Sequence, residues 1–219
     1  LIMNKIERSW LIFGGGFGMY GYLPAILSYP NNKVYLDVKY QKIITERVEL
    51  NKLLESIFWY EKIETIIHKV NSVVVATNPK SQTEIILDLL NHQFINNLVL
   101  EKPLAVNPKV SNDVLSKLIN SKKNFVFGYS FLYTNWFLDV KNAIYQANHK
   151  IIYFDWFFMA HHFVNNKMTW KNNHIKGGGV IRFYGIHLIA LLAELGYFEV
   201  KYSKIKVDSQ GFLIDWKAS

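Results

Sequence analysis

A glycine-rich stretch near the start of the chain constrains the fold more than any other feature. The apolar residues 10–13 lead into Gly14-Gly15-Gly16-Phe17-Gly18-Met19-Tyr20-Gly21, and the run that begins at Tyr22 is typical of a helix. Strand, glycine loop and helix in this order favour a dinucleotide-binding turn, because glycines let the backbone approach a pyrophosphate and helix amides point at its oxygens. Two registers fit: Gly16, Gly18 and Gly21, or Gly14 and Gly16 with Met19 in the third glycine position.

The residues up to 128 alternate between short apolar strands and amphipathic helices. We expect strands at 33–36, 56–60, 72–76, 98–100 and 124–128, and helices at about 81–91 and 110–118. Apolar strands separated by helices predict a doubly wound parallel sheet, because a strand reaches a parallel neighbour only through a crossover connection. The fold class is therefore predicted as α/β, with a doubly wound parallel sheet that forms one domain over residues 1–128.

The sequence changes character after residue 128. An aromatic-rich helix is expected over 131–147 and a strand over 151–159. A strongly apolar helix over 180–195 follows three consecutive glycines, and two further strands are expected over 198–207 and 212–216. These features predict a smaller α+β domain over residues 129–219 with a mainly antiparallel sheet.

Charge and cysteine content narrow the classes of partner. The chain carries a formal charge of +8 and has no cysteine. Its lysines are scattered along the chain, which favours an anionic small molecule such as a nucleotide over nucleic acid. Without cysteine there are no disulfides or thiolate metal sites. His161, His162 and His174 have no carboxylate at ligand spacing, so we expect no metal. No apolar run is long enough to span a bilayer and the start is charged, so we expect a cytoplasmic protein without a membrane segment.

Polar residues follow several expected strands, at ends that a parallel sheet brings to one edge. Asp37 comes roughly 20 positions after the glycines, where a carboxylate bonds a ribose 2′-hydroxyl, whereas the nearby Lys39 would favour a 2′-phosphate. NAD and NADP both remain open. Lys102, after the strand at 98–100 and before Pro103, is well placed to touch a substrate.

Four motifs in this order resemble the Gfo/Idh/MocA family of NAD(P)-dependent oxidoreductases, the glucose-fructose oxidoreductase and inositol dehydrogenase type. The motifs are the glycine loop with Leu23-Pro24-Ala25, then Ala76-Thr77-Asn78-Pro79, then Glu101-Lys102-Pro103, and finally Gly177-Gly178-Gly179 leading to Gly185-Ile186-His187. Trp170-Lys171 also resembles the family's Trp-Arg. The resemblance covers residues 10 to about 196. It implies a Rossmann domain followed by a domain whose sheet often mediates dimers or tetramers, so a homodimer or higher homo-oligomer is expected.

The same resemblance implies roles for individual residues. Lys102 would bond the reacting hydroxyl and His187 would act as acid/base, which suits hydride transfer because an ammonium stabilises an alkoxide and an imidazole moves its proton. The implied cofactor contacts are Gly14, Gly16, Phe17, Gly18, Asp37, Thr77, Asn78, Pro79, Glu101 and Lys102. The implied contacts with a sugar, nucleotide-sugar or similar substrate are Tyr129, His161, Trp170, Tyr184 and His187.

Departures from the family pattern keep the activity open. Phe183 and Ala190 stand where the family commonly carries Asp residues around the histidine, Gln82 replaces a usual His, and Leu132 an Arg. The chain is also short for the family, as a naturally short member or a fragment would be. The leading hypothesis is an NAD(P)-dependent oxidoreductase acting on CH–OH or C=O groups. A catalytically altered dinucleotide-binding sensor or assembly subunit is the alternative, and a basic nucleic-acid binder is the third.

Overall fold

The computed structural model describes residues 8–147, 151–158, 165, 167–209, 211 and 213–219. The chain divides into two compact units, Leu1–Gly128 and Tyr129–Ser219.

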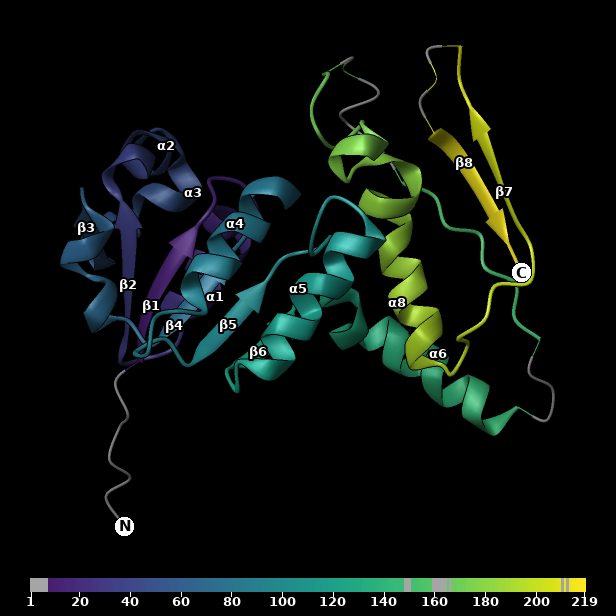
Figure 1. Ribbon diagram of the computed structural model, residues 1–219, viewed down its shortest axis with the longest axis horizontal. Helices are drawn as coiled ribbons and strands as arrows, with labels where there is room; N and C mark the ends of the chain where they lie inside the picture. Colours follow the sequence, from purple (N-terminus) through teal and green to yellow (C-terminus); the bar gives the residue numbers. More distant parts are fainter. Residues whose placement is uncertain (1–7, 148–150, 159–164, 166, 210, 212) are drawn as a thin grey trace. The chain divides into compact units, whose positions relative to one another are not determined.

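The first unit is built on a six-stranded parallel sheet (Figure 1). The strands follow the order β3-β2-β1-β4-β5-β6, and every neighbouring pair is parallel. Their bounds are β1 Arg8–Phe13, β2 Asn32–Asp37, β3 Ile57–Tyr60, β4 Ser72–Val75, β5 Asn97–Leu100 and β6 Asn124–Phe127. This is the order of a dinucleotide-binding Rossmann sheet, in which the connections reverse direction between β1 and β4. The predicted α/β Rossmann fold is confirmed.

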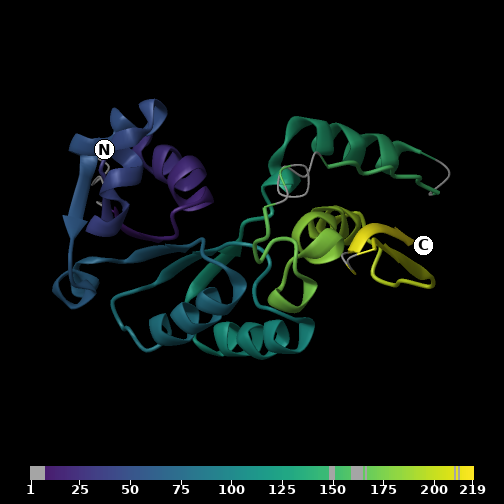
Figure 2. The ribbon, with the colours of Figure 1, turned by 90° about the horizontal axis from the view of Figure 1, so that it is seen from above.

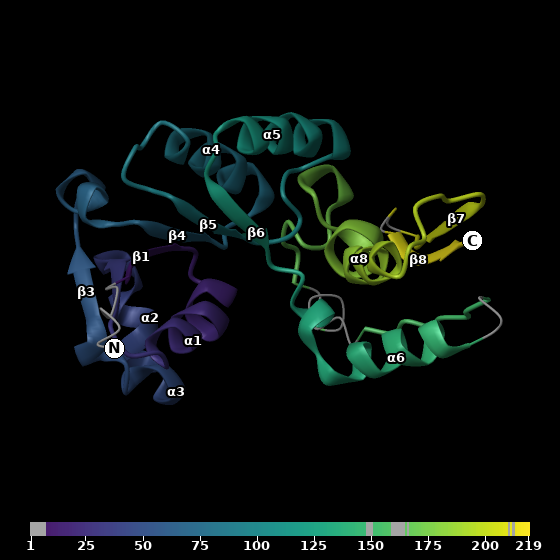
Figure 3. The same cartoon turned by 90° about the horizontal axis from the view of Figure 1, so that it is seen from below.

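Helices cover both faces of this sheet (Figure 3). On one face lie α1 (Leu23–Leu27), α2 (Gln41–Glu46) and α3 (Val48–Asn51), and on the other lie α4 (Pro79–Leu89) and α5 (Pro108–Asn120). Side chains alternate along a strand, so neighbouring residues of β1 enter different cores: Ile12 packs with the α1 side and Leu11 with the α4 side. All four residues of β4 are buried, which explains its uninterrupted valine run.

The helices that flank β5 begin with the same two-residue signal. Asn78 accepts a hydrogen bond from the amide of Ser81, and Asn107 accepts one from the amide of Val110. A proline follows each asparagine at the first helical position, where its missing N–H costs nothing. These caps place the start of each helix directly after the strand end that carries a candidate motif.

Short helical turns make up the other connections of the first unit. A π-helical turn, η1 (Gly18–Tyr22), precedes α1, so the helix after the glycines begins earlier than expected. The remaining turns are η2 (Val38–Tyr40), η3 (Leu54–Ser56), η4 (Ile63–Thr65) and η5 (Ile67–Lys69).

In its described residues, the second unit combines the α-helices α6 and α8 with a two-stranded antiparallel sheet (Figure 2). Its elements are η6 (Ser130–Tyr133), α6 (Asn135–Gln146), η7 (His174–Lys176), the π-helical η8 (Val180–Gly185), α8 (Ile186–Glu194), β7 (Ser203–Val207) and β8 (Leu213–Ala218). A hydrogen-bonded ion pair between Lys141 and Glu194 links α6 to α8. The antiparallel sheet is confirmed, although it is small.

Two sequence expectations differ from the structure in this unit. The strand expected over 151–159 is wrong for the described residues 151–158, which have no regular secondary structure. Their aromatic residues serve side-chain packing instead, since Trp156 and Phe158 join a cluster of rings. The strand expected over 198–207 is confined to residues 203–207.

Candidate functional site

The predicted cofactor residues follow the carboxyl ends of the parallel strands. Phe13 is in register with Val75, and Val75 with Leu100, so the residues after these three lie along one edge of the sheet. Gly14 follows β1, Ala76 follows β4 and Glu101 follows β5. Ligands of open α/β sheets bind at this edge, close to the point where the strand order reverses.

The turn after β1 requires a glycine at position 14. Gly14 has a φ of +117°, and a Cβ there would lie 2.1 Å from the backbone oxygen of Ala76. Its amide donates a hydrogen bond to the hydroxyl of Tyr40 at 3.2 Å. The loop therefore packs against the residue that follows β4 and is held by a hydrogen bond to the last residue of η2.

Gly16 and Gly18 have different surroundings. A Cβ at Gly16 would meet nothing within 4 Å, whereas one at Gly18 would lie 3.1 Å from the side chain of Ile12. Gly14 thus makes the turn, Gly16 leaves the backbone accessible, and Gly18 allows close packing of helix on strand. The register that starts at Gly14 fits the structure, with Gly18 taking the packing role and Met19 buried in the core.

The loop fits the pyrophosphate of a dinucleotide. The carbonyl of Gly16 accepts hydrogen bonds from Met19 and Tyr20, and the helix starts there. No acceptor in the described part of the chain contacts the amides of Gly16 and Phe17, which remain available to an anion. The ring of Phe17 is 52% exposed and contacts Tyr22 edge to face.

Asp37 and Lys39 form an ion pair at the end of β2. The Nζ of Lys39 lies 2.6 Å from Oδ2 of Asp37, and the Lys39 amide donates to Oδ1 at 2.9 Å. Partial burial of Asp37 opposes ionisation, but the hydrogen bonds and charge of Lys39 prevail and lower the pKa of the carboxyl. The carboxylate is ionised and held in place.

The Thr77-Asn78-Pro79 motif joins β4 to α4. The Asn78 side chain is engaged with Ser81, accepting from its amide and donating to its hydroxyl at 3.0 Å. Pro79 is buried, and the Thr77 hydroxyl contacts the Asn78 carbonyl at 3.4 Å. The asparagine therefore serves the helix cap, which leaves the backbone and Thr77 as the parts of this motif that could face a cofactor.

Glu101 is buried at the same edge and bonded to a residue that the sequence did not single out for a site role. The Tyr22 hydroxyl donates to Oε1 of Glu101 at 2.7 Å, while the Lys102 amide donates to Oε2 at 3.2 Å. Burial raises the pKa of Glu101, and the bond from Tyr22 and the charge of Lys102 offset part of that rise. The lack of a side chain at Gly128 makes room for the contact, since a Cβ there would lie 2.4 Å from Oε1.

Gln82 fixes the backbone around Lys102. Its Nε2 donates to the carbonyls of Glu101 at 2.6 Å, Pro103 at 3.1 Å and Leu104 at 3.3 Å, and the residue is 1% exposed. The Lys102–Pro103 peptide is cis. In the sequence, Gln82 stands out only because the family that the chain resembles usually has a histidine there. Its role is to orient the segment that carries the lysine.

His187, in the second unit, lies on α8 beside aromatic rings. It is 8% exposed, and its ring centroid is 4.5 Å from that of Phe131. Phe183, one helical turn earlier, contacts Trp170 and Tyr184 edge to face, and the Lys171 ammonium lies 5.3 Å from the Phe183 ring centre. An aromatic cluster therefore occupies the place where the family commonly has a carboxylate.

The triple glycine builds the turn in front of this helix. A Cβ at Gly178 would lie 2.1 Å from the Trp170 oxygen and 2.5 Å from that of Lys171. The amide of Gly179 donates to the Lys171 carbonyl at 2.8 Å. The Trp-Lys and triple-glycine motifs thus form one local structure.

The other predicted substrate residues are distributed over the second unit. Burial raises the pKa of Tyr184, whose hydroxyl has no hydrogen-bond partner among the described residues. Tyr129 precedes η6 and interacts electrostatically with Arg182, whose pKa is lowered chiefly by burial. His161 lies outside the described residues.

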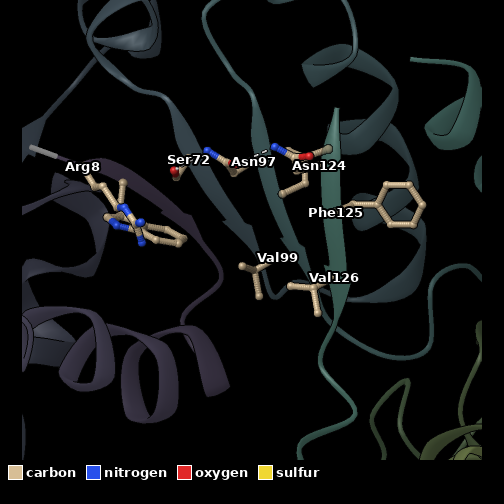
Figure 4. Close-up of a pocket in the computed structure, with 9 residues that line it drawn as sticks. Arg8, Ser72, Asn97, Val99, Asn124, Phe125 and Val126 are labelled. Carbon is tan, nitrogen blue, oxygen red and sulfur yellow. Dashed lines mark hydrogen bonds between the residues drawn. The ribbon is translucent and has the colours of Figure 1, made fainter. Parts of the chain in front are cut away.

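A pocket of about 330 Å³ lies away from the candidate site. Arg8, Ser72, Asn97 and Asn124, which begin β1, β4, β5 and β6, line it at the amino ends of the strands. Figure 4 shows Ser72, Asn97 and Asn124 in a row, joined by side-chain hydrogen bonds of 3.2 and 3.1 Å. The pocket therefore belongs to the edge opposite the glycine loop.

The described residues contain no group of three or more His, Cys, Asp or Glu side chains that could hold a metal ion. None of their helices is both long and apolar enough to cross a membrane.

Comparison with known families agrees with the geometry of the first unit. A family model described as "Oxidoreductase family, NAD-binding Rossmann fold" matches residues 9–129. The chain belongs to the Gfo/Idh/MocA oxidoreductase family. This match spans the glycine loop, Asp37, the Thr77 motif and the Glu101 motif of the family member. No curated protein sequence matches the chain significantly.

Solved structures share the fold at low sequence identity. An NAD-binding protein from Listeria innocua superposes with a TM-score of 0.67 and 18% identity, over 91% of this chain and 58% of its own. A super-repressor mutant of Gal80p from Saccharomyces cerevisiae superposes with a TM-score of 0.69 and 14% identity, over 96% of this chain and 61% of its own. A Sinorhizobium meliloti protein assigned as a myo-inositol dehydrogenase superposes with a TM-score of 0.66 and 14% identity, over 92% of this chain and 60% of its own. The chain spans less than two thirds of each of these proteins.

Proposed function

We propose that the chain is an NAD(P)-dependent oxidoreductase that transfers a hydride to or from a CH–OH or C=O group of a sugar, nucleotide-sugar or similar small molecule. The observation that carries the proposal is the geometry of the glycine loop, where Gly14 turns against Ala76 and Gly16 leaves the backbone open. Membership of an NAD-binding family supports the same conclusion. In this proposal the first unit holds the dinucleotide, and the second carries substrate contacts and assembles as a homodimer or higher homo-oligomer.

Several residues of the first unit would hold the cofactor, and a bound nicotinamide would supply the hydride chemistry. The amides of Gly16 and Phe17 would bind the pyrophosphate at the start of the helix. Asp37 would accept a hydrogen bond from a ribose hydroxyl. Thr77 and the segment from Glu101 would line the same edge of the sheet.

Lys102 and His187 are assigned the chemistry at the substrate. The Lys102 ammonium would bond the substrate oxygen and stabilise the negative charge that develops on it. Glu101 and Gln82 would keep the lysine backbone in position through their hydrogen bonds. The His187 imidazole would take up or return the hydroxyl proton. Phe183 and the rings around it would exclude water from the surroundings of His187, as in other buried active sites.

The test is a dinucleotide titration followed by turnover. The full chain is titrated with NADH and NADPH, with tryptophan-to-nicotinamide fluorescence transfer as the readout, and then assayed against sugars and nucleotide-sugars at 340 nm. We expect binding below about millimolar, the usual upper range for enzyme ligands. Turnover is expected to fall at least about 100-fold in Lys102→Met, as when an electrostatic catalyst is removed. Lys80→Met, which removes an exposed lysine on α4, is the matched control and should leave turnover unchanged.

A second candidate is a dinucleotide-binding sensor or assembly subunit without turnover. The specific observation in its favour is Phe183, whose ring is packed between Trp170 and Tyr184 where a carboxylate is usual. The similarity to the fold of Gal80p, a transcriptional regulator in Kluyveromyces lactis, is in keeping with this candidate. Tight binding of a dinucleotide combined with no turnover of any substrate, and no effect of Lys102→Met on partner assembly, would favour the sensor over the enzyme.

A further inference from the structure

The Asp37–Lys39 pair occupies the position that reads the adenosine ribose in a Rossmann fold, and an inference about it rests on the proposed function. Asp37 is the last residue of β2, and its side chain caps η2. Each carboxylate oxygen already accepts one hydrogen bond, Oδ1 from the Lys39 amide and Oδ2 from the Lys39 ammonium at 2.6 Å. The carboxylate of this chain is therefore compensated by a cation that belongs to the same turn.

The pair keeps hydrogen-bonding capacity for a ligand. A carboxylate has about four acceptor sites, so two remain on Asp37, and an ammonium has three donors, of which one is used by Asp37. The Asp37 side chain is 20% exposed and that of Lys39 is 60% exposed, so both are within reach of solvent. One ion pair thus offers an acceptor for a hydroxyl and a donor for a phosphate at the same place.

The surroundings of the pair hold it beside the glycine loop. Tyr40, the next residue, accepts the hydrogen bond from the Gly14 amide, and its ring lies 5.1 Å from the Lys39 ammonium. Tyr60 is the register partner of Asp37 on β3, and burial and the neighbouring carboxylate raise its pKa. Tyr60 therefore stays neutral, and the net charge of the Asp37–Lys39 pair is zero.

Charge decides how such a site treats the two coenzymes. A lone carboxylate repels the 2′-phosphate of NADP while it bonds the 2′-hydroxyl of NAD, and this is the usual source of NAD selectivity. Here the repulsion is neutralised by Lys39, and the same ammonium can turn toward the phosphate. We propose that Lys39 is a specificity-determining residue that makes this chain bind NAD(H) and NADP(H) with comparable affinity.

The experiment measures the Kd of NADH and of NADPH by isothermal titration calorimetry on the full chain and on three variants. The parent chain is expected to bind both with Kd values within about tenfold, or about 1.4 kcal/mol. Lys39→Ala should raise the Kd of NADPH by about 10- to 100-fold, the scale of one or two charge-assisted contacts. It should change the Kd of NADH by less than about threefold. Asp37→Asn should weaken NADH more than NADPH.

The control for charge is Lys42→Ala. Lys42 lies on α2 with a side chain 82% exposed, and its Nζ is 3.7 Å from the Glu46 carboxylate. This variant removes the same charge three residues away, so it should alter both Kd values equally and by less than about threefold, the scale of a screened surface charge.

Two results overturn the inference while leaving the proposed function in place. They are a parent chain that favours one coenzyme by more than about tenfold, and a Lys39→Ala variant in which both coenzymes change equally. Binding of neither coenzyme would instead overturn the proposed function itself, and the inference would fall with it.

Discussion

The hydrogen bond from Tyr22 to the buried Glu101 makes a prediction whose size depends on pH. Tyr22→Phe removes a hydroxyl that lies 2.7 Å from Oε1 of a residue only 9% exposed. A hydrogen bond to a charged group contributes about 1.5–3 kcal/mol, and one to a neutral group about 1 kcal/mol. The phenol remains a donor throughout, because burial and the neighbouring carboxylate raise the pKa of Tyr22.

The sign of the pH effect follows from the pKa of Glu101. Burial raises that pKa in the folded state, and the Tyr22 bond lowers it in part, so the variant raises it further. A group whose pKa is raised on folding stabilises the folded state fully at pH values below its pKa in the unfolded state. This stabilisation is lost as the pH rises through its pKa in the folded state. The stability lost in Tyr22→Phe should therefore be about 1.5–3 kcal/mol where Glu101 is ionised and shrink toward about 1 kcal/mol in acid, where Glu101 is protonated.

Hydrogen exchange measured by mass spectrometry can follow the loss of stability in the first unit alone. Peptides that cover β5 and β6 are followed in the full chain at pH 7 and at the most acidic pH where it stays folded, with rates corrected for intrinsic pH dependence. Tyr29→Phe is the matched control, since Tyr29 is 70% exposed and should change protection little. An equal loss at both pH values, or no loss at pH 7, would refute the assignment of Glu101 as a buried carboxylate held by Tyr22.

Three other substitutions test separate parts of the structure. Gly14→Ala should destabilise the first unit by about 2 kcal/mol or more, because the new Cβ meets the Ala76 oxygen at a φ of +117°; differential scanning calorimetry measures it. Gln82→Leu should cost about 2–3 kcal/mol by leaving buried carbonyls unbonded, and faster exchange of the Lys102 amide would report it. Gly178→Ala should disturb the second unit through its clash with Trp170, seen as a loss of near-ultraviolet circular dichroism, and an unchanged aromatic signal would contradict the packing.

The sheet was predictable because its strands are apolar and separated by helix signals. The valine run at 73–75 is buried on both sides, as a central parallel strand must be, and the Asn-Pro caps mark the starts of α4 and α5. The expected strand is absent from the described residues 151–158 because alternating aromatic residues can serve ring packing as well as strand pairing. The Trp156 ring instead contacts Phe131 and Phe158.

The site was only partly predictable, since its supporting contacts join residues far apart in the chain. Tyr22 and Glu101 are 79 residues apart, and a tyrosine in a helical turn carries no signal that it will bond a particular glutamate. Gln82 reaches the Lys102 segment across 19 or more positions. The register of the glycine motif also needed the structure, because only the positive φ of Gly14 and the open space at Gly16 distinguish the two alternatives.

The most direct test of the account is dinucleotide binding by the parent chain and by Gly16→Val. A Cβ at position 16 meets no atom within 4 Å, so the variant should fold with an unchanged melting temperature, yet its side chain would fill the space in front of the loop amides. We predict saturable binding of NADH or NADPH by the parent chain and none by Gly16→Val. Equal binding by the two proteins, or no binding by the parent, would contradict it.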